Sequence, residues 1–177
     1  MSINITSVCK LGFLSGLLLT TLTACDQQTS SNPHIAYVDL NQVIKKSPVG
    51  DQQEARLKMI KDTLLKASSQ ANDLYKDMPE AQKTKSMVAD AAVLNKEWQR
   101  EVRKTRATTM QAIVNSVEKY RKGHGISLVL TRGAVLSGNA GEDISNDIIT
   151  SLADTHVNYG KLPEVQIKKQ SEQENNK

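Results

Sequence analysis

The chain has 177 residues, with 23 Lys and Arg, 19 Asp and Glu, and a formal net charge of +4 at pH 7. Only 3% of the residues are aromatic, and large aromatic side chains supply much of the burial in a compact core. This composition argues against a dense globule and favours an elongated or oligomeric protein. The middle of the chain is rich in Ala, Lys, Glu, Gln, Leu and Met, which favour long helices.

The first 24 residues have the pattern of a secretory signal peptide. Lys10 precedes an apolar run at residues 11–22, which is shorter than the roughly 20 residues that span a bilayer but has the length of a signal-peptide core. The run ends in LTAC, which resembles a lipobox, the bacterial signal for acylation of a cysteine and cleavage before it. We expect residues 1–24 to be a lipoprotein signal peptide and Cys25 to carry the lipid. The alternative is an ordinary signal peptide with a chance cysteine.

Residues 25–34 read CDQQTSSNPH and are expected to form a polar tether. Three acyl chains on Cys25 would hold the protein durably at a membrane, facing the periplasm. Asp26 and Gln27 resemble the signal that retains enterobacterial lipoproteins in the inner membrane, so the inner membrane is favoured over the outer one. Because Cys9 leaves with the signal, the mature chain would have no disulfide. It would keep 22 basic and 19 acidic residues, a net charge of +3.

We expect one α+β domain over residues 35–156. The sequence HIAYVDL at 34–40 predicts a short strand, and residues 41–46 predict a short helical turn. The sequence SPVG at 47–50 is expected to interrupt that turn, because proline disfavours helix in the residue before it and glycine costs conformational entropy.

Apolar residues then recur at steps of three and four, which is typical of a coiled-coil seam. The pattern predicts a long antiparallel helical hairpin over about 51–122, with its tip near Met78 because Pro79 ends the first helix. The seam of the first helix is Leu57, Ile60, Leu64, Ala67, Ala71, Leu74 and Met78. The seam of the second helix is Met87, Ala91, Leu94, Trp98, Val102, Thr105, Thr109, Ile113, Val117 and Tyr120.

Two further short strands are expected after the hairpin, at 126–131 and 134–136, followed by a helix that Asp143 or Ser145 caps. Residues 157–177 are polar and predict a disordered tail. Three short strands cannot bury both faces of a sheet alone. A small sheet that carries a long hairpin is therefore expected to gain its stability in an oligomer.

Four segments of the chain resemble the Skp/OmpH family of periplasmic chaperones: IAYVDLNQVIKKSPVG, the long hairpin, GISLVLTRGAVLSG and DISNDIITSLA. The resemblance covers residues 35–156. It implies a homotrimer in which strands build a small β-barrel body and three helical hairpins project as tentacles around a cavity. Unfolded outer-membrane proteins are held there without ATP. The chain departs from the family pattern in its lipobox, its shorter hairpin and its polar C-terminal tail.

The hairpin carries an excess of positive charge, with 15 Lys and Arg against 10 Asp and Glu over residues 51–122. Such arms would attract acidic clients or anionic lipid, although an ordinary solvated coiled-coil face explains the charge equally well. Two methionines flank the predicted tip, where they would contact clients or simply close the coil. The candidate client-binding residues are Met78, Met87, Arg100, Arg103, Lys104 and Arg106.

The sequence has no catalytic or metal-binding pattern. His34, His124 and His156 have no Cys or carboxylate at ligand spacing, and the S-x-x-K match that begins at Ser116 lacks its partner motifs. We therefore expect neither an enzyme nor a cofactor, and an exported protein does not meet nucleic acid. Two functions remain. One is a membrane-tethered, ATP-independent holdase for unfolded envelope or outer-membrane proteins, and the other is a coiled-coil scaffold or assembly factor of an envelope machine.

Overall fold

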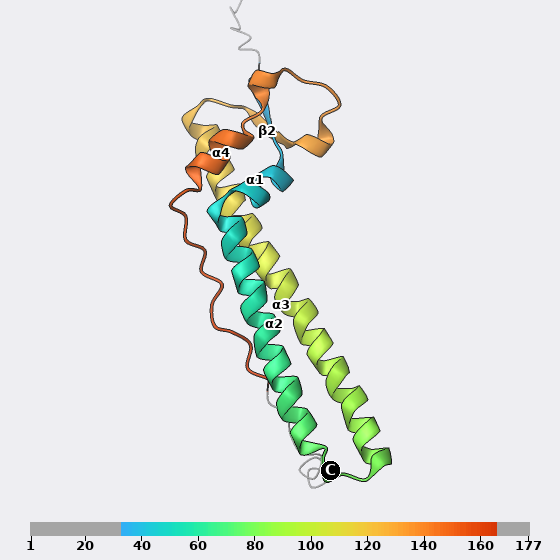
Figure 1. Cartoon of the computed structure of the whole chain (residues 1–177). Coiled ribbons are helices and arrows are strands. Elements are labelled where there is room, and N and C mark those ends of the chain that lie inside the picture. Colours follow the sequence, from blue (N-terminus) through green and yellow to red (C-terminus); the bar gives the residue numbers. More distant parts are fainter. Residues whose placement is uncertain (1–32, 166–177) are drawn as a thin grey trace, which may run out of the picture. The chain divides into compact units, whose positions relative to one another are not determined.

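The computed structural model describes residues 33–165, so the signal segment, Cys25 and most of the tether lie outside the described residues. The described part is mostly helical with a small sheet, which confirms the α+β composition (Figure 1). In chain order the elements are β1 (Ile35–Val38), α1 (Leu40–Lys46), α2 (Pro48–Leu74), α3 (Glu80–Gly123), β2 (Leu128–Thr131), the 3-10 turns η1 (Arg132–Ala134) and η2 (Ala140–Glu142), and α4 (Ser145–Ser151).

The sheet of the described residues has two parallel strands, β1 and β2, which are joined through α1, α2 and α3. Ile35 lies opposite Leu128, and Val38 lies opposite Thr131. The main chain of Tyr37 also forms a bridge to Asp143, which ties the segment before α4 to the sheet.

The expected strand at 134–136 is wrong. The chain turns instead at η1, where the N–H of Val135 donates to the carbonyl oxygen of Arg132 at 3.1 Å. Leu136 beyond it is fully exposed. The apolar side chains of this segment suggested a strand. In the turn, however, the N–H of Val135 is already hydrogen-bonded and cannot pair with a neighbouring strand.

The sequence SPVG ends α1 at Ser47, as expected, and it also begins α2. Ser47 is the N-cap, and Pro48 lies in the first turn, where its missing N–H leaves no partner unsatisfied. Gly50 lies against the end of α1, and an added Cβ would stand 1.7 Å from the carbonyl oxygen of Ile44. Glycine therefore allows the close approach of the two helices, and α2 starts before Asp51, the expected first residue.

The core lies where the sheet, α1, α4 and the last turns of α3 meet. Its buried side chains are Ala36, Val38, Val43, Val49, Ile113, Ile126, Ile144, Ile148 and Leu152. The N-cap of α4 is Ile144, so neither Asp143 nor Ser145 holds the predicted cap position. Asp143 still performs that task, because its Oδ1 accepts from the N–H of Ser145 at 2.9 Å.

The helices α2 and α3 lie side by side and run in opposite directions, joined by residues 75–79 (Figure 1). On α2, Ile60, Leu64 and Ala67 are buried as predicted, and so is Ala71. On α3 the predicted seam is fully buried only in the half nearer the core, at Thr105, Thr109 and Ile113. Farther out, Leu94 and Trp98 of the seam are half-buried, Met87 and Ala91 are exposed, and Ser86 is buried instead.

The buried stripe of α3 departs from a heptad because its steps are all of four residues from Glu101 to Ile113. Four residues turn an α-helix by about 40° more than one full turn. A stripe with this spacing moves around the helix, whereas alternating steps of three and four keep it on one side. The buried stripe therefore passes through Glu101, whereas the predicted seam passed through its neighbour Val102, which is half-buried.

The chain beyond α4 is not disordered throughout, contrary to the expectation for residues 157–177. The described part of this region, residues 157–165, lies along α2 (Figure 1). Pro163 is buried, and Val157 packs against the core. The segment has no apolar periodicity because polar side chains of α2 bind its main chain, so hydrophobic patterning could not reveal it.

Candidate functional site

A groove of about 550 Å³ lies between the outer parts of α2 and α3. It is lined by Lys61, Leu64, Leu65, Ser68, Ala91, Leu94, Asn95 and Trp98. Leu65 is 57% exposed, whereas its neighbour Leu64 is 8% exposed and faces α3. The groove therefore offers apolar surface that the described chain does not itself cover.

A second hollow, of about 210 Å³, continues this groove toward residues 75–79, since both are lined by Ser68, Ala91 and Leu94. Its outer end is closed by the hydroxyl of Tyr75, which hydrogen-bonds to the carboxylate of Asp90. Burial, together with that hydrogen bond and the negative charge of Asp90, raises the pKa of Tyr75 to about 12. The pair fixes the ends of α2 and α3 around the groove.

The groove lies where the outer halves of the two predicted seams pack incompletely. From α3 it is lined by Ala91, Leu94, Asn95 and Trp98, opposite Leu64 of α2. Val88 and Val93 on the same half of α3 are 67% and 58% exposed. Both helices therefore keep exposed apolar side chains, and such residues mark interaction sites when they are contiguous.

The two candidate methionines lie at different places. Met78 is half-buried in the connection between α2 and α3. Met87 is 44% exposed and lines the hollow beside Tyr75. Of the two, Met87 is the one whose side chain borders the groove.

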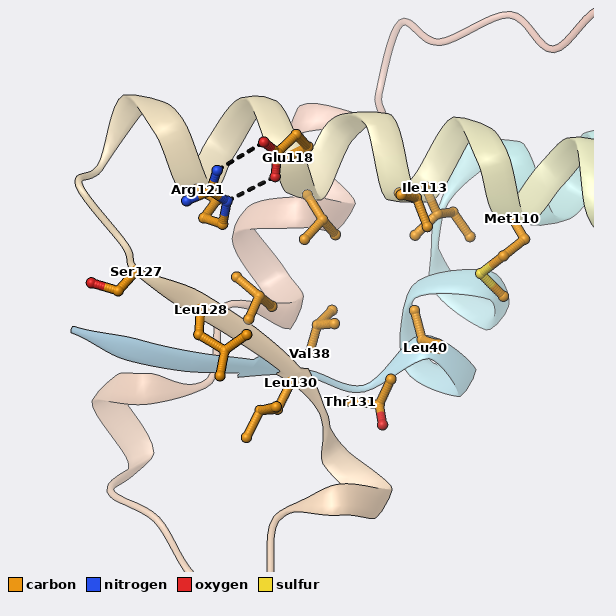
Figure 2. A pocket seen from close by; sticks show the side chains of 13 residues that line it. Val38, Leu40, Met110, Ile113, Glu118, Arg121, Ser127, Leu128, Leu130 and Thr131 are labelled. Carbon is orange, nitrogen blue, oxygen red and sulfur yellow. Dashed lines mark hydrogen bonds and ion pairs between the residues drawn. The ribbon is translucent and has the colours of Figure 1, made fainter. Parts of the chain in front are cut away.

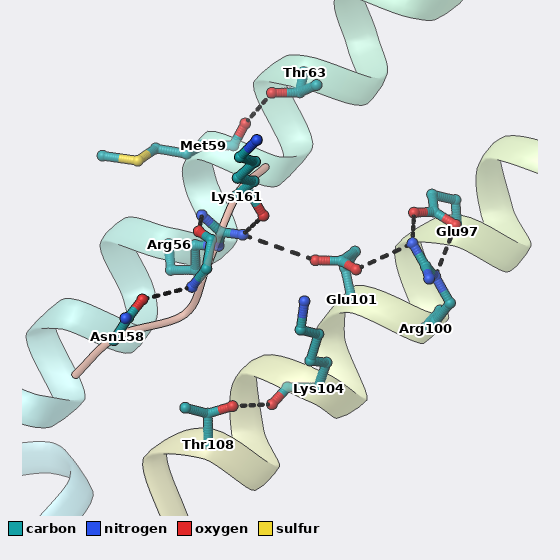
Figure 3. Close-up of polar contacts among 11 residues, drawn as sticks. Arg56, Met59, Thr63, Glu97, Arg100, Glu101, Lys104, Thr108, Asn158 and Lys161 are labelled. Carbon is teal, nitrogen blue, oxygen red and sulfur yellow. Dashed lines mark hydrogen bonds and ion pairs between the residues drawn. The ribbon is translucent and has the colours of Figure 1, made fainter. Parts of the chain in front are cut away.

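The four candidate cations of α3 divide into two kinds, of which Figure 3 shows one example each, Arg100 and Lys104. The guanidinium of Arg100 pairs with Glu97 and, at 3.3 Å, with Glu101, and the hydrogen bond to Glu97 is the main reason that its pKa is raised. Arg103, Lys104 and Arg106 are exposed. Within residues 33–165, these three side chains form no ion pair, so their charge is available to solvent and partners.

A separate apolar hollow of about 360 Å³ lies between α3 and the sheet (Figure 2). Val114 of α3 and Leu128 of β2 border it and are 48% and 47% exposed. At its rim, Glu118 accepts hydrogen bonds from Arg121 at 2.7 and 2.8 Å. These bonds and the one from Lys122 lower the pKa of Glu118 to about 2. An ionised pair therefore borders an otherwise apolar surface.

Buried charges near the core end of the arms were missed by the sequence analysis. Arg56 is 8% exposed and Glu101 is 2% exposed, and their nearest atoms lie 4.0 Å apart. From the sequence, both residues would be assigned to the solvent-exposed face of a coiled coil, because charged residues are usually exposed. Only the neighbouring C-terminal segment explains why Arg56 is covered.

Side chains that bind metal ions do not cluster in the part of the chain that the structure describes. No group of three or more His, Cys, Asp or Glu side chains in residues 33–165 could hold a metal ion. His124 stacks on Tyr120, with ring centroids 3.8 Å apart. None of the helices in the described ranges is long and apolar enough to cross a bilayer. Cys25, Asp26 and Gln27 lie outside the described residues.

These features define a small α+β body with two long helices that leave apolar surface open. Residues 34–152 match the family described as Outer membrane protein (OmpH-like), and the chain belongs to this family. The family resemblance drawn from the sequence is thereby confirmed. The chain is also similar to the crystal structure of a candidate outer membrane chaperone (OmpH-like) from Caulobacter crescentus CB15, with 18% identity and a TM-score of 0.44 over 68% of this chain and 83% of that one. No curated protein sequence matches the chain significantly.

Proposed function

We propose that the protein is an ATP-independent holdase chaperone that binds unfolded envelope or outer-membrane proteins in the periplasm. The observation that carries this proposal is the apolar groove between α2 and α3, which the described chain leaves uncovered. An unfolded protein exposes apolar segments of many sequences, and an open groove of about 550 Å³ accommodates them without requiring one shape. Membership of the OmpH-like family supports the proposal.

We further propose a homotrimer in which the apolar hollow at the sheet is the contact between copies. A parallel pair of four-residue strands is too small to be stable as an independent sheet. Leu128 projects from that sheet with 47% of its surface exposed. Contact with a second copy would cover this surface, and the helix pairs of three copies would then act as tentacles around a shared cavity.

We propose that acyl chains on Cys25 anchor the protein in a membrane and that residues 25–34 are the tether. Asp26 and Gln27 would favour the inner membrane, with the chaperone facing the periplasm. Anchoring would restrict the protein to clients that emerge near that membrane. We assign it no catalytic role and no cofactor.

A scaffold of an envelope machine is the second candidate, and the pair of long helices favours it as much as the first. The two differ in their partners. A scaffold binds one partner at fixed stoichiometry, whereas a holdase suppresses the aggregation of many unrelated clients. The exposed apolar side chains of Leu65 and Met87, which line the groove and the hollow that continues it, favour the holdase.

The experiment measures aggregation of a denatured outer-membrane protein after dilution into the purified protein. We expect a several-fold excess of the wild type to suppress aggregation without ATP. Leu65→Ser should weaken the suppression because Leu65 lines the groove. Met59→Ser is the matched control, since Met59 is 54% exposed on the same helix but does not line it. Failure of the wild type to delay aggregation would leave the scaffold as the better account.

A further inference from the structure

The segment that follows α4 is held by side chains of α2 that bind its main chain. Nε2 of Gln52 donates to the carbonyl oxygen of Thr155 at 2.7 Å. Oε1 of the same side chain accepts from the N–H of Val157 at 2.9 Å. One amide thus pairs with the two main-chain groups on either side of His156, as a neighbouring strand would.

One turn farther along α2, Arg56 binds the same segment (Figure 3). Its Nη1 donates to the carbonyl oxygen of Gly160 at 3.1 Å, and its Nη2 donates to that of Lys161 at 2.5 Å. Because Gln52 and Arg56 are four residues apart, they project from the same face of the helix. Together they form a row of donors and acceptors along the path of an extended chain.

The carboxylate of Glu101 on α3 holds the guanidinium of Arg56 in position. Oε2 of Glu101 lies 4.0 Å from its Nη2, and Glu101 is 2% exposed. The other carboxylate oxygen of Glu101 pairs with Arg100 at 3.3 Å. A buried carboxylate between two guanidinium groups limits how far Arg56 can move, so its two donors stay directed at the bound segment.

All four hydrogen bonds that Gln52 and Arg56 make with the segment involve its main-chain atoms; three are donated to carbonyl oxygens and one is accepted from an N–H. The segment's own side chains contribute little hydrogen bonding to the arms, apart from the hydroxyl of Tyr159, which lies 2.9 Å from that of Thr109. Main-chain groups are the same in every polypeptide except at proline. This face of α2 therefore recognises an extended chain by a feature that does not depend on its sequence.

The bound segment lies beyond the part of the chain that matches the family. The family match ends at residue 152, and Leu152 is also the last fully buried residue of the core cluster. Gly160, within the segment, has a φ of +72°, a value that side chains other than glycine rarely adopt. The segment therefore lies outside the matched family region, and its path requires a glycine at position 160.

We propose that Gln52 and Arg56, supported by Glu101, form a binding site for the main chain of extended polypeptides, and that residues 155–161 occupy it in cis. The inference rests on the proposed function in one respect, namely that unfolded clients supply the competing chains. A segment attached directly to α4 has a high effective concentration at the site. A client would displace it only when further contacts, such as those in the groove, add to its affinity.

The test uses a fluorescent peptide with the sequence of residues 154–165 and follows its binding by anisotropy. We expect at least about tenfold tighter binding to a chain that ends after Ala153 than to the full chain, because the cis segment is gone. Gly160→Val in the full chain should give an intermediate affinity, since it disfavours the bound turn. Equal affinity of the full and shortened chains would overturn the occupancy in cis.

Variants of the shortened chain test the site itself. Gln52→Ala should weaken peptide binding by about tenfold through the loss of two hydrogen bonds. Gln53→Ala is the matched control and should leave binding unchanged, since the side chain of Gln53 makes no hydrogen bond within the described residues. Arg56→Ala should weaken binding as strongly, and circular dichroism will show whether this variant folds.

The peptide supplies the decisive comparison. N-methylation at Val157 removes one main-chain donor and should weaken binding by several-fold, whereas replacing His156 and Lys161 by alanine should not. Equal binding of the N-methylated peptide would overturn main-chain recognition. A shortened chain that suppresses client aggregation but does not bind the peptide would overturn this inference and leave the proposed function intact. Peptide binding by a shortened chain that does not suppress aggregation would support the main-chain site and overturn the proposed holdase function.

Discussion

The hydroxyl of Tyr75 joins the end of α2 to Asp90 on α3, at the point where the groove closes. Tyr75 has a pKa of about 12 in the folded protein, against about 10 in an unfolded chain. The folded state therefore holds this proton more tightly than the unfolded state does. The resulting stability is fully present below pH 10 and is lost as the pH rises from about 10 to 12.

Tyr75→Phe should lower the free energy of unfolding by about 1 kcal/mol at pH 7, because one hydrogen bond is lost. It should also reduce the decline in stability above pH 10. Urea unfolding of both proteins between pH 7 and 11.5 measures the two effects. Parallel pH profiles for the wild type and the variant would mean that the hydroxyl does not bind Asp90 in solution.

Two adjacent leucines on α2 differ in burial, so the same substitution at each position tests how α2 packs on α3. Leu64 is 8% exposed and Leu65 is 57% exposed. Leu64→Ala should lower the free energy of unfolding by about 2–3 kcal/mol, since it removes buried side-chain volume. Leu65→Ala should change it by less than about 0.5 kcal/mol, while it weakens client capture. Equal loss of stability in both variants would contradict the packing of α2 on α3.

The basic residues of α3 require a more selective experiment than the sequence suggested. Arg100 contacts the buried carboxylate of Glu101, so its reversal would disturb the fold together with the surface charge. Reversal of Arg103, Lys104 and Arg106 to Glu should slow capture of an acidic unfolded client several-fold at low salt. The difference should vanish at high salt, because exposed charges act mainly on encounter and are screened over about 8 Å at physiological ionic strength. Stopped-flow capture measures both rates.

The sequence predicted the elements that rest on local patterns. The strand at residues 34–40, the long helices and the buried α2 positions from Ile60 to Ala71 follow from periodicity and from helix-ending residues. In the outer half of α3 the burial of Ser86 was missed, because its neighbour Met87 is more apolar, whereas Leu94 and Trp98 of the predicted seam do line the groove. The groove itself could not be predicted, since periodicity shows which residues face the other helix but not how closely the two helices pack.

The C-terminal segment shows a different limit. Its partners Gln52 and Arg56 lie more than 100 residues away along the chain, and no local pattern encodes a side chain that binds distant main-chain atoms. At the other end, the lipidation of Cys25 is a prediction that rests on the lipobox alone. Its place in the fold is not needed for that inference, because a processing signal is read as sequence.

Two residues of the small sheet separate folding from assembly at the scale of the whole molecule. Val38 is 3% exposed within one chain, whereas Leu128 is 47% exposed at the apolar hollow. Leu128→Asp should therefore give folded monomers, while Val38→Asp should unfold the body, because an unpaired charge in a core is strongly destabilising. Sedimentation and circular dichroism distinguish these results. A monomeric wild type at micromolar concentration would contradict the proposed trimer.

Anchoring is tested separately from folding, since Cys25 lies outside the described residues. Cys25→Ser should abolish palmitate incorporation and release the protein from the membrane fraction. Undiminished labelling of the variant would contradict acylation at this thiol. Asp26→Ser should shift the protein toward the outer membrane fraction, and an unchanged distribution would remove the sorting role of Asp26 and Gln27.

The parallel pairing of β1 with β2 also constrains the order of folding. Ile35 and Leu128 are direct neighbours across the sheet, although the whole helix pair separates them in sequence. Closure of so long a loop carries an entropic penalty, and contacts between distant residues slow folding. Zipping of α2 against α3 from residues 75–79 brings the two strand segments together and shortens the loop that remains. The connection at the far end of the arms therefore governs how fast the sheet forms, and destabilising it should slow folding even though it makes no contact with the sheet.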